Sequence, residues 1–176
     1  ACCKANECTH LMDMDTDEFY KTEQIQKAKE KIEAGGYDAS FCQMQTYYKR
    51  PTTRLLPSEQ YYVPLIYKIT NRSKFESIDN IDYPVLCDGK RRIKSKYPYV
   101  FSRGEIEMHH LSYVRKDEAS MRSKFENCSS IQNFPKERID KLITCWLEHY
   151  EGQPILFGKD QVFQTIEVPN YFNIKI

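Results

Sequence analysis

The sequence lacks several features that would assign the chain to a class at once. Its 176 residues contain no apolar run near the ~20 residues that a membrane-spanning helix needs, so no membrane span is expected. The charges nearly balance, because 26 Lys and Arg face 25 Asp and Glu and leave a net charge of +1. Nucleic-acid-binding proteins carry a clear basic excess, so nucleic acid is not an expected partner. Internal repeats and low-complexity tracts are also missing.

The cysteines form no recognisable framework. They are Cys2, Cys3, Cys8, Cys42, Cys87, Cys128 and Cys145. No two of them have Cys-x-x-Cys spacing, so a structural zinc site is not expected. An odd, scattered set fits no disulfide pattern and indicates a reducing compartment, which predicts a cytoplasmic location. We expect these side chains to be small buried hydrophobic groups.

Hydrophobic periodicity predicts an α/β domain with a mixed sheet. The expected helices cover residues 22–34, 114–128 and 135–150, and the expected strands cover residues 8–14, 37–48, 61–69, 97–101, 105–111 and 161–168. Pro51 and Pro57 bracket a predicted loop, and Pro64 predicts that its strand lies at an edge or carries a bulge. Strands that alternate with helices predict one domain over residues 1–176, with a mixed central sheet flanked by helices.

Two of the predicted helices have clear boundaries and apolar faces. Thr22 is the expected N-cap of the first, and Gly35 and Gly36 should end it. Pro135 suits the first turn of the last helix. The expected buried stripes are Ile25, Ala28 and Ile32 in the first, and Ile139, Leu142, Ile143, Trp146 and Tyr150 in the last.

A dense group of acids follows the first predicted strand, in the segment THLMDMDTDEFY at residues 9–20. Clustered carboxylates repel one another unless a positive charge lies among them, and Mg²⁺ or Mn²⁺ favours oxygen ligands. On an extended strand end, alternate side chains point the same way, so Asp15 and Asp17 are expected to converge on one cation. Asp13 would join them only if the extension continues.

Two other interpretations of these acids compete with a metal site. Asp17 and Glu18 are placed to cap a following helix through its dipole. A calcium loop of the EF-hand type is excluded, because counting from Asp13 the sixth position is Glu18 rather than Gly, and the twelfth is Gln24 rather than Glu.

The acidic segment resembles the metal-binding segment of GT-A glycosyltransferases, in particular family-2-like members. The resemblance continues in YDASFCQMQTYYKRPTTRL, YYVPLIYKI and EIEMHHLSYVRKD, and covers most of residues 8–130. Among these proteins the chain is most similar to small virus-encoded transferases that decorate capsid protein. The resemblance implies a Rossmann-like GT-A fold. Its Asp-x-Asp motif falls on Asp15 and Asp17, which would bind Mn²⁺ or Mg²⁺ against the diphosphate of a UDP- or GDP-sugar.

The same resemblance implies transfer of a sugar to a hydroxyl of a glycan or glycoprotein acceptor. His109 and His110 follow each other on a strand and so face opposite ways. In the family a late histidine often completes the metal shell or contacts the diphosphate, and we favour His110 for this role. Arg115, beside Lys116, is expected to open the next helix and to contact phosphate, or else to be a solvated helix start.

The catalytic base has several candidates. An inverting transferase needs a carboxylate to take the proton from the acceptor, and the candidates are Asp88, Glu59 and Asp117. A retaining enzyme needs no such base there. The basic run Lys90, Arg91 and Arg92 either receives an acidic ligand or forms a solvated loop.

Two departures from the GT-A pattern qualify the expectation. Only about a dozen residues precede Asp13, so the nucleotide-binding portion that begins full GT-A domains is expected to be missing. The QxxRW signature of processive synthases is absent, since Cys145 precedes Trp146, which favours addition of single sugars. A non-catalytic carbohydrate- or cation-binding module and a metal-dependent phosphoryl transferase or nuclease remain as alternatives; the last would need further acids around two ions.

Overall fold

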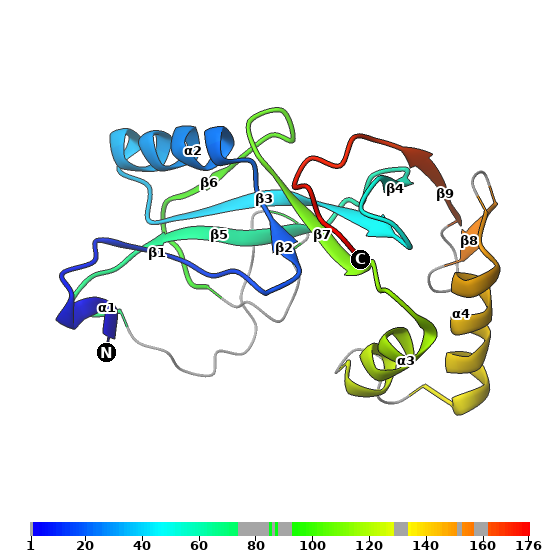
Figure 1. Ribbon diagram of the computed structural model, residues 1–176. Coiled ribbons are helices and arrows are strands. Elements are labelled where there is room, and N and C mark those ends of the chain that lie inside the picture. The colour runs from blue at the N-terminus through cyan, green and yellow to red at the C-terminus, as the bar shows by residue number, and fades with distance from the viewer. Residues whose placement is uncertain are drawn as a thin grey trace. The chain divides into compact units, whose positions relative to one another are not determined.

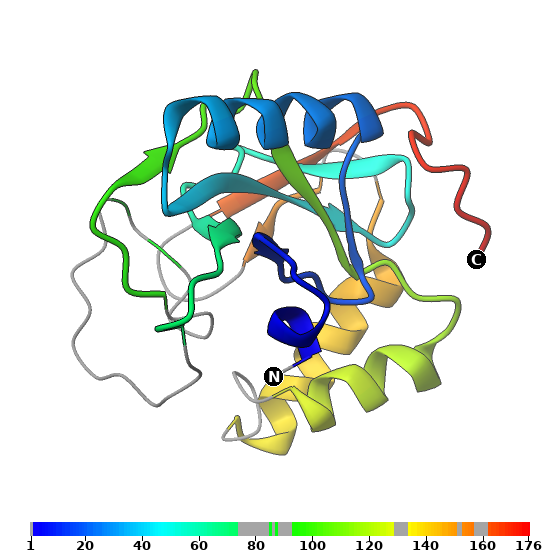
Figure 2. The ribbon, with the colours of Figure 1, turned by 90° about the vertical axis from the view of Figure 1, so that its left-hand side faces the viewer.

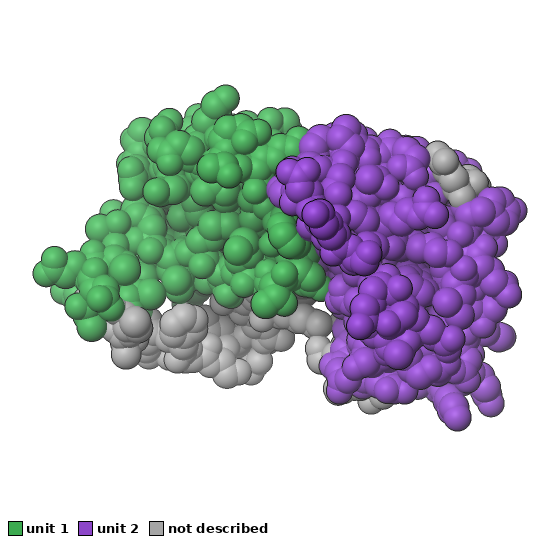
Figure 3. All heavy atoms as spheres, in the orientation of Figure 1, with its two compact units in different colours: residues 1–45, 59–109 green, residues 46–58, 110–176 purple. Residues whose placement is uncertain are grey.

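The computed structural model is an α/β fold with a mixed β-sheet, as the sequence predicts (Figure 1). It describes residues 2–73, 85, 87, 93–128, 134–150, 153–156 and 162–176. Within those ranges, none of the helices has the length and apolar character needed to cross a membrane. The chain forms two compact units, coloured in Figure 3: residues 1–45 with 59–109, and residues 46–58 with 110–176. The GT-A arrangement of such a fold stays a prediction.

The first unit is built on antiparallel strands. β1 (His10–Met12) pairs antiparallel with β5 (Tyr62–Lys68), which pairs antiparallel with the first part of β3 (Ala39–Tyr48). β6 (Pro98–Val100) runs parallel to β3 on its other side, and makes the sheet mixed. α1 (Cys2–Ala5) precedes these strands.

Two further strands connect to this sheet. The short β2 (Glu18–Phe19) pairs with β7 (Glu107–Tyr113), and β7 also pairs with β3. Sequence periodicity does not predict β2, because a two-residue strand has no period of its own. It forms through its pairing with β7, which is far away in sequence.

Pro64 is accommodated by a β-bulge within β5. Ala39 of β3 faces Tyr67, whereas Phe41 faces Pro64, so β5 contains one residue more than β3 between these pairs. A bulge frees the backbone position that proline cannot use for a ladder hydrogen bond. The bulge alternative is confirmed, and the edge-strand alternative is wrong because β5 lies between β1 and β3.

α2 (Thr22–Gly35) covers one face of the first unit's strands, as Figures 1 and 2 both show. Its apolar stripe is confirmed: Ala28 and Ile32 are buried, and Ile25 packs against them. The helix ends as predicted, because Gly36 adopts a left-handed φ of 66° and its N–H bonds to the carbonyls of Glu33 and Ile32. The predicted N-cap is wrong, since Lys21 occupies that position without a side-chain hydrogen bond. The core of the unit consists of Ala28, Ile32, Cys42, Val63, Leu65, Ile66, Phe101, Ile106 and Met108.

The described part of the second unit contains β4, β8, β9, the ends of β3 and β7, and the helices α3 and α4. β4 (Thr53–Leu56) pairs antiparallel with β9 (Val162–Glu167), which pairs antiparallel with β8 (Ile155–Leu156). β4 lies inside the loop predicted between Pro51 and Pro57, so that prediction is wrong. An ion pair of 2.7 Å between Arg122 Nη1 and Asp140 Oδ1 links α3 (Glu118–Asn127) to α4 (Lys136–Glu148). The core of this unit consists of Tyr48, Leu55, Met121, Phe125, Ile143, Trp146, Ile155 and Phe163.

Both helices are shorter than predicted. α3 begins at Glu118 rather than residue 114, because Val114 N–H closes a turn on the Leu111 carbonyl and Asp117 is the N-cap. In α4, Ile143 and Trp146 are buried as predicted, whereas Tyr150 follows the helix and is 68% exposed. The helical stripe therefore does not extend to Tyr150.

Candidate functional site

The acidic segment leaves the sheet where β1 ends. β1 is held by β5 in a register that places His10 opposite Lys68 and Met12 opposite Ile66. Beyond Met12 the chain is no longer a strand, and residues 16–17 form a turn before β2 begins at Glu18. The prediction that Asp15 and Asp17 lie on an extended strand end is therefore wrong, and a tight turn carries them instead.

This turn, which we call the acidic turn (residues 15–18), is closed from both ends. The backbone N–H of Glu18 donates to the Asp15 carbonyl at 3.1 Å. The backbone N–H of Asp15 donates in return to Glu18 Oε2, also at 3.1 Å. Aspartate is favoured at the first position of such turns. The two bonds fix the backbone on which both acids of the Asp-x-Asp pair stand.

Burial separates the acids of this segment into two kinds. Asp13 and Asp15 are exposed and Asp17 is half-buried, whereas Glu18 is only 5% exposed. The buried Glu18 thus holds the backbone of the turn through its hydrogen bond to Asp15, while the side chains of Asp13 and Asp15 are exposed to solvent and that of Asp17 partly so. The sequence pattern does not predict this role of Glu18, and the one local signal for its burial is its position directly before the apolar Phe19.

The helix-capping alternative for these acids finds no support in the geometry. α2 begins at Thr22, and its N-cap, Lys21, makes no side-chain cap. Asp17 and Glu18 precede that position, and Glu18 bonds to Asp15 instead. The acids are therefore not the cap of α2.

The turn offers a metal ion a small set of ligands. In the described part of the chain, no group of three or more His, Cys, Asp or Glu side chains is arranged to hold a metal ion. Two carboxylates suffice for Mg²⁺ or Mn²⁺ when water and substrate phosphates supply the other ligands. The Cα atoms of Asp15 and Asp17, two residues apart, are separated by at most ~7 Å, which one ion can bridge. The two carboxylates therefore fit such a cation when water and phosphate oxygens supply its remaining ligands.

The adjacent histidines have different environments within β7. His109 is buried at 1% exposure, and its Nε2 lies 4.0 Å from Glu107 Oε1. Glu107 also accepts a hydrogen bond from Arg103 Nη1 at 2.5 Å. His110 is half-buried and belongs to the second unit, whereas the acidic turn belongs to the first. The role expected of His110 as a metal ligand stays a prediction.

Arg115 does not open a helix, because α3 begins three residues later. Its Nη1 donates to the carbonyls of Leu111 at 3.2 Å and Val114 at 2.9 Å. The guanidinium thereby fastens the turn that follows β7. Its expected contact with phosphate stays a prediction.

Asp117 has a defined structural role as the N-cap of α3. Its carboxylate accepts a hydrogen bond from Ser120 N at 2.8 Å, and Ser120 Oγ closes a capping box on the Asp117 N–H at 3.4 Å. The hydrogen bonds from Ser120 lower the pKa of Asp117, and the nearby Lys116 lowers it further. A catalytic role for Asp117 stays a prediction.

Among the other candidates for the catalytic base and for phosphate binding, the structure describes a contact made by Glu59. The carbonyl of the half-buried Glu59 accepts a hydrogen bond from Arg103 Nη2 at 2.8 Å. Asp88 and the basic run at residues 90–92 lie outside the described residues.

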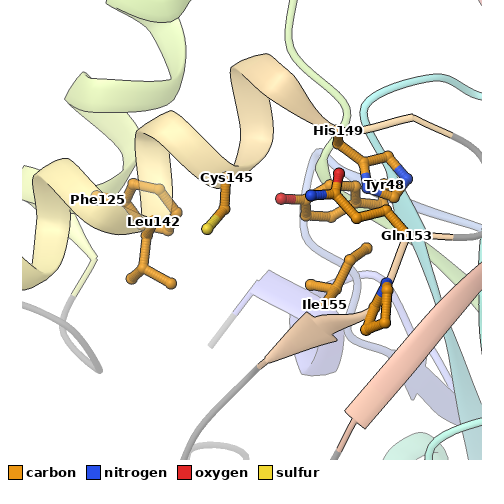
Figure 4. A pocket seen from close by; sticks show the side chains of 8 residues that line it. Tyr48, Phe125, Leu142, Cys145, His149, Gln153 and Ile155 are labelled. Carbon is orange, nitrogen blue, oxygen red and sulfur yellow. The ribbon is translucent and has the colours of Figure 1, made fainter.

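The second unit contains a pocket of about 80 Å³ that the sequence does not predict (Figure 4). It is lined by Tyr48, Phe125, Leu142, Cys145, His149, Gln153, Pro154 and Ile155. Burial raises the pKa of Tyr48, and Cys145 and Tyr113 raise it further. Burial lowers the pKa of His149, and the neighbouring Lys49 ammonium lowers it further. Both side chains are therefore neutral at pH 7.

The cysteine prediction holds in part. Among the described cysteine side chains, Cys42 is buried, whereas Cys8 and Cys145 are exposed. Cys145 faces the pocket of the second unit rather than a core.

Comparisons of the chain with protein-family models, with curated proteins and with solved structures found no match.

Proposed function

We propose that the chain is a metal-dependent glycosyltransferase of GT-A type, with Asp15 and Asp17 as its metal ligands. The observation that carries the proposal is the acidic turn, in which the buried Glu18 closes the backbone that carries the exposed Asp15 and the half-buried Asp17. The Asp-x-Asp-Glu-Phe segment after a short strand, which resembles the family's metal motif, supports the same assignment.

The chemistry of the turn suits a nucleotide-sugar donor. When bound, Mn²⁺ or Mg²⁺ would neutralise the charge that develops on the departing nucleoside diphosphate. Asp15 and Asp17 would hold that cation through one or two carboxylate oxygens and leave positions for phosphate oxygens. Glu18 would act as a positioning residue, because its bond to Asp15 N–H fixes the turn.

The reaction proposed is a single transfer. The bond between C1 of the sugar and the diphosphate oxygen breaks, and C1 forms a bond to the acceptor oxygen. The hydroxyl proton of a glycan or glycoprotein acceptor passes to a base. UDP or GDP leaves with the electron pair of the broken bond.

The test is release of UDP or GDP from a panel of UDP- and GDP-sugars, with Mn²⁺ and with EDTA. Wild-type protein should release UDP or GDP with Mn²⁺ but not with EDTA. Asp15→Asn and Asp17→Asn should each abolish this release. Asp13→Asn is the matched control, because Asp13 is an exposed acid outside the acidic turn. A non-catalytic module would bind nucleotide or sugar without release, and that result would contradict the proposal.

A further inference from the structure

An aromatic row in the first unit leads from its core to its surface. Phe101 is 2% exposed and meets Tyr99 edge-on, with ring centroids 4.8 Å apart. Tyr99 lies 4.8 Å from Tyr37, and Tyr37 stacks on Tyr97 at 4.9 Å with 24° between the planes. Tyr97, at the outer end, is 58% exposed. The ring of Tyr97 is therefore exposed to solvent and packs on its inner side against the other rings of the row.

The backbone around Tyr97 is fixed by Asp38. The Asp38 carboxylate accepts hydrogen bonds from Ser95 Oγ, from Lys96 N at 2.8 Å and from Tyr97 N at 3.0 Å. The Asp38 N–H donates to the Tyr97 carbonyl at 3.1 Å. These bonds connect the residue that precedes β3 to the residues that precede β6, the strand that pairs with β3. The segment that carries the exposed ring is held in place before any ligand arrives.

Tyr37 is positioned by a glycine. A Cβ atom on Gly35 would clash with the Tyr37 ring, so this ring occupies space that only glycine leaves open. The same Tyr37 ring stacks on Tyr97, with ring centroids 4.9 Å apart. A substitution at Gly35 would consequently displace the Tyr37 ring, on which Tyr97 stacks, and would leave residue 97 itself unchanged.

We propose that the exposed ring of Tyr97 binds a pyranose ring of the glycan acceptor. A fixed aromatic ring attracts the polarised C–H groups on a sugar face through its negative π surface, and binding loses little entropy when the ring is already ordered. The tyrosine hydroxyl adds a donor and an acceptor for sugar hydroxyls. The acceptor's identity rests on the proposed function, but the contact itself requires neither metal nor nucleotide.

The charges around the row favour a neutral ring over a nucleotide. Lys31 Nζ lies 5.1 Å from the Tyr99 centroid, and the Tyr99 hydroxyl donates to Glu105 at 2.8 Å. Asp38 accepts a hydrogen bond from the N–H of the exposed Lys96, and Lys94 is exposed as well, so the described charges beside Tyr97 are of both signs. A neutral pyranose needs no charge of either sign, whereas a diphosphate is repelled by carboxylates among the cations.

Saturation-transfer NMR of the full chain tests the inference. The probes are methyl β-glucopyranoside, methyl β-galactopyranoside, methyl α-mannopyranoside, N-acetylglucosamine and uridine. The samples contain EDTA and no nucleoside diphosphate, so that binding to the proposed metal site does not contribute. At least one pyranoside should receive saturation on the C–H groups of one ring face. Tyr97→Ala and Tyr97→Leu should reduce that signal by about three- to tenfold, and Tyr97→Phe should retain it. Gly35→Ala should weaken it as well. No transfer to any pyranoside, equal transfer in Tyr97→Ala, or transfer to uridine alone would overturn the proposal.

Tyr61→Ala is the matched control, because Tyr61 is 46% exposed in the same unit and has no ring partner among the described residues. It should leave pyranoside binding unchanged, and circular dichroism should show every variant folded. The Asp15→Asn/Asp17→Asn double variant should bind pyranosides normally. If the wild-type protein binds UDP or GDP in a manganese-dependent way but binds no pyranoside, this inference alone is contradicted. If it binds a pyranoside but shows no manganese-dependent binding of UDP or GDP, the proposed function alone is contradicted.

Discussion

The carboxylate of Glu18 accepts a hydrogen bond from the backbone N–H of Asp15 at 3.1 Å, while the Glu18 N–H donates to the Asp15 carbonyl at the same distance. This reciprocal pair joins a residue that is 5% exposed to one that is exposed. A buried carboxylate needs hydrogen-bond donors, and here the backbone of the acidic turn supplies one. The proposed metal ligands are thereby linked to the interior of the first unit.

Removing the Glu18 carboxylate should weaken metal-dependent nucleotide binding although Glu18 is not a proposed ligand. Glu18→Ala loses the acceptor for Asp15 N–H, and loss of such a supporting contact costs about 10- to 100-fold in metal affinity. Glu18→Gln keeps an acceptor oxygen and should lose less. Titration of Mn²⁺ at saturating UDP or GDP measures both. Equal affinity in Glu18→Ala and wild type would show that the turn needs no such support.

Substitutions at Asp117 separate helix capping from catalysis. Asp117→Ala removes the acceptor for Ser120 N–H and should lower the unfolding midpoint by a few degrees. Asp117→Asn keeps a capping oxygen and should preserve the midpoint. If Asp117 is the catalytic base, Asp117→Asn stops sugar transfer at an unchanged midpoint; if it is only the cap, transfer continues. Paired thermal and transfer measurements on the two variants distinguish these roles.

His149 should make the stability of the chain sensitive to mild acid. Burial holds its pKa in the folded state below the ordinary value of 6.5, so the unfolded chain takes up the proton first as pH falls. Stability is then full above 6.5 and decreases on acidification toward the folded-state pKa. The carboxyl groups of Asp38, Glu105 and Asp117 have a pKa below their ordinary acidic values, so they do not titrate between about pH 5.5 and 7.5.

Thermal unfolding between about pH 7.5 and 5.5 measures this effect. The midpoint should fall by a few degrees in wild type and by less in His149→Gln, which keeps a polar side chain beside Thr165. Identical pH profiles for the two proteins would exclude His149 as the group responsible.

Lys49 should stabilise the end of α4. Its Nζ donates to the carbonyl of Leu147 at 2.6 Å and to that of His149 at 3.2 Å, where the helix leaves carbonyls without partners in its own ladder. Lys49→Met should therefore reduce the free energy of unfolding by about 1 kcal/mol. Urea denaturation measures the change, with the exposed Lys116→Met as control. An unchanged midpoint in Lys49→Met would contradict this capping role.

Much of the fold follows from local patterns in the sequence. The stripe of Ile25, Ala28 and Ile32 predicts α2, and the strands at 37–48 and 61–69 are close to β3 and β5. The misses have a common cause, which is pairing between distant segments. β4 lies between two prolines and depends on β9, and β2 and β8 have two residues each and depend on β7 and β9.

The sequence predicts which residues form the candidate site, but it does not predict how the chain positions them. Asp15 and Asp17 are marked by their spacing and by the strand before them, yet the turn that carries them depends on Glu18, whose burial no local pattern reveals. Asp117 was noted for its charge, while its role as the cap depends on Ser120. The stack of Tyr37 on Tyr97 joins residues sixty positions apart in the sequence.

Calorimetric titration of UDP and GDP, with and without Mn²⁺, tests the central claim most directly. For wild type and the Asp13→Asn control, Mn²⁺ should raise the affinity for at least one nucleotide by about tenfold or more. For the Asp15→Asn/Asp17→Asn double variant, Mn²⁺ should produce no increase although the protein stays folded. An equal manganese-dependent gain in the double variant would contradict the assignment of the acidic turn as the metal site.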